Sequence, residues 1–191
     1  MAGVSNPTDL KSTIDAGSTQ KTFIVQLAFL GDTGSAYFNV TSGSSNPSSD
    51  ENKTQFDFVG KKKLSKAFSL GFNGTYALTT NDLDSALDGE WFSLVGYVNF
   101  IVKESSSVAY RLEYLDAKQA TDRLGLLTGT SVIGNTLSLN YKVGHLTIIP
   151  EFRIDTASKY IFTNSDAAPK GLTAYVLLAT TYSFWFYIFC C

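Results

Sequence analysis

The chain has 191 residues, a formal net charge of −2, 17% charged residues and 14% aromatic residues. The charged share is lower than in an ordinary soluble domain, and no excess of positive charge is available for the phosphates of a nucleic acid, so we expect no nucleic-acid partner. Cys190 and Cys191 are adjacent and His145 is the only histidine, which leaves no disulfide framework, no spaced metal site and no Ser-His-Asp triad.

The N-terminal segment, residues 1–20, shows no regular pattern. It lacks the basic start and the apolar stretch of a signal peptide. We expect it to be flexible or to be the remnant of an upstream strand. The longest apolar run of the whole chain, residues 184–191, is far shorter than the ~20 residues of a membrane-spanning helix.

Between residues 21 and 184, apolar and polar residues alternate with a period of two, which predicts strands with one apolar face. In segment 135–143, for example, leucine, tyrosine and valine alternate with threonine, serine, asparagine and lysine. In chain order the alternating segments are 22–29, 36–40, 56–58, 68–78, 92–102, 108–114, 135–143, 145–155 and 172–184. These segments predict about nine strands, and no segment predicts a helix.

The connections between these segments alternate in length. The short ones are residues 31–34, 61–65 and 103–106 and the turn at Gly144. The long ones are residues 42–53, 79–89, 116–131 and 156–170, all rich in Ser, Asp, Asn, Gly or Thr. Short periplasmic turns that alternate with long extracellular loops are typical of outer-membrane barrels with an up-and-down antiparallel meander.

If the short turns lie in the periplasm, the direction of every strand follows, and aromatic residues of the apolar faces fall toward both strand ends. The periplasmic group is Phe29, Phe68, Phe100, Tyr141, Tyr182 and Phe184. The outer group is Phe23, Tyr76, Phe92, Tyr114 and Phe152. Two aromatic girdles around an apolar band indicate two membrane interfaces.

A soluble all-β domain, such as a lipocalin-like barrel or a sandwich, would show the same alternation, with its apolar faces turned inward. The low charge content, the sorted connections and the two girdles favour the membrane interpretation. We therefore predict an all-β fold, an antiparallel up-and-down transmembrane β-barrel with about nine to ten strands, over residues 21–184, followed by an apolar tail at 185–191.

The number of strands raises the question of how the sheet closes. A sheet in lipid must pair all its edges, and outer-membrane barrels ordinarily have an even number of strands. We expect a further strand upstream or hidden in residues 1–20. Four arrangements stay open: the strands curl into a barrel alone, form part of a larger barrel, pair with a second copy, or complete the sheet of another partner.

Several short motifs carry a resemblance to a known family. They are Leu70-Gly-Phe-Asn-Gly-Thr-Tyr76, Arg111-Leu-Glu-Tyr114 with Asp116, Pro150-Glu-Phe-Arg-Ile-Asp155, and Thr181-Tyr-Ser-Phe184. In this order, over residues 68–184, they resemble the C-terminal half of the OmpL-like β-barrel porins of bacteria. The resemblance implies an outer-membrane porin without catalytic residues, inserted by the barrel-insertion machinery that recognises a terminal phenylalanine. The chain departs from this pattern because it continues past Phe184.

Charged residues on the polar faces of the predicted strands are candidates for the lining of a pore. They are Arg111, Glu113, Lys142, Glu151, Arg153 and Asp155. Such residues could form an electrostatic constriction that selects solutes. Because both signs occur at close spacing, they could equally pair across the sheet and order its interior.

Two further charged groups lie in connections. The acids Asp82, Asp84, Asp88 and Glu90 occupy one long loop, which could hold a calcium ion or simply be solvated. The lysines at 61–63 lie at a predicted periplasmic turn, where they could contact lipid headgroups or only solubilise the turn.

The sequence thus predicts an outer-membrane porin for passive diffusion of small solutes. Its expected partners are outer-membrane lipid, small solutes and the insertion machinery, and no cofactor or enzymatic activity is expected. The alternative is a non-conducting structural or ligand-binding barrel, either anchored in the membrane or soluble and lipocalin-like.

Overall fold

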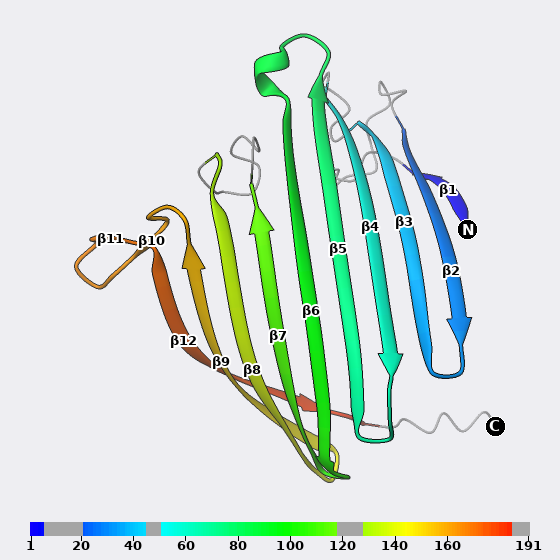
Figure 1. Cartoon of the computed structure of the whole chain (residues 1–191), viewed down its shortest axis with the longest axis vertical. Coiled ribbons are helices and arrows are strands. Elements are labelled where there is room, and N and C mark those ends of the chain that lie inside the picture. Colours follow the sequence, from blue (N-terminus) through cyan, green and yellow to red (C-terminus); the bar gives the residue numbers. More distant parts are fainter. Residues whose placement is uncertain (6–20, 45–50, 118–127, 185–191) are drawn as a thin grey trace, which may run out of the picture.

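The computed structural model describes residues 1–5, 21–44, 51–117 and 128–184. They form one ten-stranded sheet in which each strand pairs antiparallel with the next, in the order β1 to β9 and then β12 (Figure 1). The strands are β1 (Ala2–Ser5), β2 (Thr22–Gly31), β3 (Gly34–Ser44), β4 (Glu51–Lys63), β5 (Phe68–Asn81), β6 (Gly89–Lys103), β7 (Ser106–Asp116), β8 (Ser131–Val143), β9 (Leu146–Ala157) and β12 (Leu172–Tyr182). The prediction of an all-β antiparallel meander with nine to ten strands is confirmed.

The tenth strand is β1, which lies in the segment where a hidden strand was predicted. It pairs with β2, with Ala2 opposite Val25 and Ser5 opposite Thr22. Four residues are too few to show an alternating pattern. The remainder of that segment, residues 6–20, and the predicted tail, 185–191, lie outside the described residues.

The strands are longer than the alternation alone indicated. From β2 onward the strands of the large sheet have between 10 and 15 residues, which suffices for a tilted strand to cross a bilayer. Strand β4 has 13 residues although only 56–58 were recognisable in the sequence. Its first half, residues 52–55, is polar on both faces, so no alternation is visible there.

The connections are sorted by length at the two ends of the sheet (Figure 1). At the turn end, short turns join β2 to β3, β4 to β5, β6 to β7 and β8 to β9. At the loop end, the long connections include the 3₁₀ helix η1 (Ser85–Leu87) and a small hairpin of β10 (Phe162–Thr163) and β11 (Pro169–Lys170). In the described part of the chain, no helix is long and apolar enough to cross a membrane.

Strands β1 and β12 are the two edges of the sheet, and among the described residues no pairing joins them. The sheet is strongly twisted, and β12 runs across the back of the view in Figure 1. Closure of the barrel by this pair of edges is therefore not observed.

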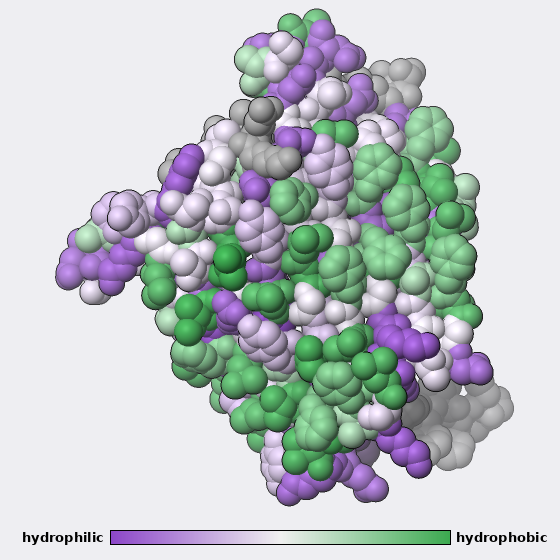
Figure 2. Space-filling model, in the orientation of Figure 1, coloured by the Kyte–Doolittle hydropathy of each residue, from purple (hydrophilic) through white to green (hydrophobic). Residues whose placement is uncertain are grey.

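The burial of side chains is the reverse of that in a soluble barrel. Ala77 and Ala117 are the only buried hydrophobic residues among those described, whereas seven buried residues are polar or charged. On β8, Leu137 is 47% exposed while its neighbour Thr136 is 2% exposed. The strands thus present an exposed apolar face, seen in Figure 2, and a covered polar face. An apolar surface of this extent is typical of contact with lipid.

Candidate functional site: the polar face of the sheet

Four charged side chains form a continuous chain of ion pairs on the polar face. Arg111 Nε lies 3.3 Å from Glu113 Oε1. Glu113 Oε2 pairs with Arg153 Nη1, and Arg153 Nε donates to both carboxylate oxygens of Asp155 at 2.9 and 3.0 Å. This charge chain, Arg111, Glu113, Arg153 and Asp155, has two charges of each sign and no net charge.

Strand register brings these residues together across β8. Glu113 and Asp155 both lie opposite Gly134, and Arg111 and Arg153 both lie opposite Thr136. A Cβ atom on Gly134 would stand only 2.8 Å from Arg153 Nη2 and 2.8 Å from Asp155 Oδ1. Glycine at this position therefore gives the side chains of β7 and β9 the room to meet above β8.

The other two predicted pore-lining residues lie on the polar face but outside the charge chain. Glu151 accepts a hydrogen bond of 2.7 Å from Ser138 Oγ. Lys142 is exposed near the turn end of β8. Within the charge chain, the side chains of Arg111 and Glu113 are 35% and 26% exposed, whereas those of Arg153 and Asp155 are only 19% and 10% exposed. Ion pairs with so little exposure are screened less by salt than surface pairs.

A second polar cluster, which the sequence did not single out, crosses β2 to β5. Asp57 accepts hydrogen bonds from Asn39 Nδ2 at 2.9 Å, from Asn73 Nδ2 at 2.8 Å and from Thr75 Oγ1 at 2.8 Å. Gln26 Nε2 extends the row by donating to Asn39 Oδ1 at 2.8 Å. The alternation placed each residue on a polar face, but only the register of four strands shows that they meet.

Two loop residues line a cavity beside the charge chain. A cavity of about 390 Å³ is lined by polar-face residues of β6 to β9, among them Glu113 and Arg153, and also by Ile161 and Phe162 at the start of the β10–β11 hairpin. Ile161 and Phe162, from the long connection after β9, therefore lie beside the polar-face residues Glu113 and Arg153. The cavity combines charged and apolar walls.

The eleven predicted girdle residues all lie on the apolar face, and none is buried. Phe92 and Tyr114 have ring centroids 5.5 Å apart on neighbouring strands, and Tyr182 stacks on Phe184 at 6.4 Å. Phe152 lies near the middle of β9 rather than toward one of its ends. The eleven residues are Phe23, Phe29, Phe68, Tyr76, Phe92, Phe100, Tyr114, Tyr141, Phe152, Tyr182 and Phe184.

The acidic loop between β5 and β6 uses its carboxylates to hold its own backbone and a neighbouring side chain. Asp84 caps η1 by accepting a 2.9 Å hydrogen bond from Ala86 N, and Asp88 accepts one of 2.7 Å from Asn81 N. Glu90 accepts a hydrogen bond from the Tyr76 hydroxyl. Within the described residues, no group of three or more His, Cys, Asp or Glu residues is placed to hold a metal ion.

A comparison with protein families extends the resemblance carried by the short motifs. Residues 1–184 match the family model described as "Putative beta-barrel porin-2, OmpL-like". The match covers the whole ten-stranded sheet, including β1 to β4, for which the sequence motifs gave no resemblance. Neither a curated protein nor a solved structure matches the chain.

Proposed function

The chain belongs to the OmpL-like β-barrel porin family, and we propose that it forms a passive diffusion pore for small solutes in the bacterial outer membrane. A β-barrel porin family implies an outer-membrane location and is not a family of enzymes. The reversed burial carries the proposal: large apolar side chains such as Leu137 and Phe152 are 47% and 46% exposed on strands that are long enough to span a bilayer. The opposite face supplies polar side chains to a water-filled path.

The charge chain is the element of this path that selects among solutes. Two arginines and two carboxylates create a strong local electric field although their net charge is zero. Neutralising any one of the four residues therefore leaves a net charge of one unit at this place. Charged side chains at a narrow point of a pore set its ion selectivity. We place the narrow point of the path at the cavity that Arg153 and Phe162 both line.

A conducting pore also needs a closed wall. The backbone groups along the free edges of β1 and β12 would be unpaired in lipid, where each unpaired group costs several kcal/mol. A second copy of the chain, or further strands from a partner, closes the wall by pairing with these two edges. The ten strands of one copy are an even number, as in bacterial outer-membrane barrels.

A non-conducting structural barrel is the second candidate function. The observation in its favour is that Ile161 and Phe162, from the long connection after β9, line the same cavity as Glu113 and Arg153 of the charge chain. A barrel whose interior is filled by such a loop anchors the envelope or holds a small ligand without passing ions.

Single-channel conductance in a planar bilayer separates these possibilities. The protein is folded in detergent, and a folded barrel is recognised by heat-modifiable migration on a gel. Stepwise conductance is the expected result. A protein that folds and inserts but stays silent would support the structural barrel, and a protein that stays folded in solution without detergent would overturn the membrane placement.

A further inference from the structure

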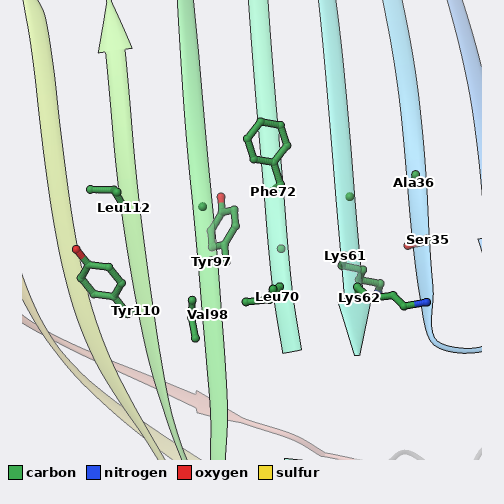
Figure 3. A pocket seen from close by; sticks show the side chains of 13 residues that line it. Ser35, Ala36, Lys61, Lys62, Leu70, Phe72, Tyr97, Val98, Tyr110 and Leu112 are labelled. Atoms are coloured by element: carbon green, nitrogen blue, oxygen red, sulfur yellow. The ribbon is translucent and has the colours of Figure 1, made fainter. Parts of the chain in front are cut away.

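The apolar face contains a hollow that the porin function does not use. It has a volume of about 580 Å³ and extends across β3 to β7 toward the turn end (Figure 3). Its lining includes Ala36 of β3 and Tyr97 of β6, and the large side chains that it takes from the apolar face of β5 to β7 are Leu70, Phe72, Val98, Tyr110 and Leu112. Because the apolar face faces lipid in the proposed orientation, the hollow opens toward the membrane.

The hollow forms because small residues occupy one cross-strand row of the apolar face. One cross-strand row of the apolar face runs from Ala36 through Gly60, Phe72 and Gly96 to Leu112. Three of these five residues are alanine or glycine, whereas bulky apolar residues occupy most of the surrounding positions. A Cβ atom at Gly96 would meet nothing within 4 Å. The floor at Gly96 is therefore open space, and the sheet itself has no side chain to fill it.

A lysine stands at the edge of this hollow. Lys62 lies on the apolar face of β4, opposite Leu70, and it lines the hollow together with Lys61. The aliphatic part of Lys62 packs over Gly34, and its Nζ donates a 2.8 Å hydrogen bond to Thr33 Oγ1 in the β2–β3 turn. Figure 3 shows its nitrogen directed toward β3. A lysine that directs its charge along an apolar surface to the membrane edge reaches the level of the lipid headgroups.

The turns beside the hollow are strongly basic. Residues 31–34 and 61–68 contain Lys61, Lys62, Lys63 and Lys66 and a single acid, Asp32. The hollow therefore combines an apolar cradle with an excess of positive charge at its turn-end edge. This combination complements a molecule with an apolar chain and an anionic head.

We propose that this lysine-rimmed hollow binds one anionic glycerophospholipid from the leaflet at the turn end. One acyl chain packs over Gly96, and the phosphate accepts a hydrogen bond from the ammonium group of Lys62. The acyl chain fills the hollow, so the side chains that line the hollow gain van der Waals contacts that they would lack if it were empty. A second copy of the protein fits less well, because a two-fold contact at this surface would bring like-charged lysines together in a medium of low dielectric constant.

Native mass spectrometry of the full chain in detergent micelles tests this proposal. The micelles contain equal amounts of phosphatidylglycerol and phosphatidylcholine with identical acyl chains. The expected result is one retained phosphatidylglycerol in preference to phosphatidylcholine. Lys62→Gln is expected to reduce this retention about fivefold, the factor that corresponds to about 1 kcal/mol for one lysine near an anionic headgroup. Lys103→Gln, in another turn at the same end, is the matched control and is expected to retain the lipid.

A second pair of variants tests the apolar cradle. Gly96→Leu fills the floor of the hollow and is expected to abolish selective retention, whereas Ala174→Leu adds bulk at an exposed position in the same cross-strand row and is expected to leave retention intact. If Gly96→Leu does not fold, as judged by heat-modifiable migration, the two lysine variants decide the question alone.

Three results would overturn the proposal. The first is equal retention of both lipids. The second is an equal loss of retention with Lys62→Gln and Lys103→Gln. The third is a dimer of the chain that Gly96→Leu removes and Ala174→Leu preserves, which would assign the hollow to a second copy. A silent channel that retains phosphatidylglycerol would contradict the porin proposal but leave this lipid site in place.

Discussion

Glu113 on β7 and Arg153 on β9 form an ion pair across the intervening strand β8. Their strands are not neighbours, and the side chains meet above Gly134, which lies directly opposite Glu113 of β7 and directly opposite Asp155 of β9. The pair therefore links three strands through side chains in addition to the backbone ladder. Substitutions around this pair test both the stability of the sheet and its proposed selectivity.

Gly134→Ala is expected to destabilise the folded protein by about 1–3 kcal/mol, the usual cost of an overpacked site. The added methyl group would lie 2.8 Å from Arg153 Nη2 and from Asp155 Oδ1, so the ion pairs must shift. Urea unfolding in detergent measures the effect. Gly96→Ala is the control, because its methyl group meets nothing within 4 Å and should leave the stability unchanged or slightly higher. Equal losses in both variants would contradict the role given to Gly134.

Arg153→Gln is expected to shift the selectivity of the pore toward cations. The substitution leaves Arg111 against two carboxylates, so the charge chain gains one negative charge at a poorly screened position. The reversal potential in a potassium chloride gradient reports this shift. Lys142→Gln changes the net charge equally, but at an exposed position near the turn end, and should shift the reversal potential less. Glu113→Gln should shift it in the opposite direction.

Asp57→Asn is expected to lower the free energy of unfolding by about 1–3 kcal/mol. An asparagine offers one acceptor oxygen and turns an NH₂ group toward donors, whereas Asp57 accepts from Asn39, Asn73 and Thr75. Unfolding in urea at several protein concentrations provides the measurement. Asp32→Asn, at an exposed turn, makes the same chemical change and should have little effect. Similar values for the two variants would show that the hydrogen bonds of Asp57 contribute nothing specific.

Phe162→Ala is expected to raise single-channel conductance, because Phe162 lines the cavity beside Arg153 and its removal widens the path. Tyr160→Ala serves as the control in the same loop, since Tyr160 is 74% exposed and does not line this cavity. If neither variant changes the conductance, the β10–β11 connection does not form the narrow point.

Leu137→Arg is expected to destabilise the membrane-inserted protein by about 2–4 kcal/mol, the cost of arginine at the lipid-facing middle of a barrel strand. Leu137 is 47% exposed at the centre of β8. In a soluble protein the same exposed position would tolerate the change to within about 0.5 kcal/mol. Asn140→Arg, on the polar face of the same strand, is the control, and unfolding in lipid vesicles measures both. A negligible effect at Leu137 would contradict lipid contact on this face.

The sequence by itself predicted most of the sheet. Nine of the strands, the two faces of each strand and the sorting of short and long connections follow from alternation and from turn residues, which are local properties of the chain. The bounds of β1 and the first half of β4 escaped prediction, because a four-residue strand is too short to alternate and residues 52–55 are polar on both faces. Phe152 was predicted to lie toward the outer end of its strand. Because β9 continues to Ala157, Phe152 lies near the middle of the strand instead.

The neighbours across strands were decided only by the tertiary structure. Alternation assigns Arg153 to the polar face, but its pairing with Glu113 depends on the register of two strand pairs and on a glycine between them. The hydrogen bonds of Asp57 depend on register in the same way, and so does the hollow at Gly96. Register results from backbone pairing between residues far apart in the chain, whereas the face of a side chain follows from its position along its own strand.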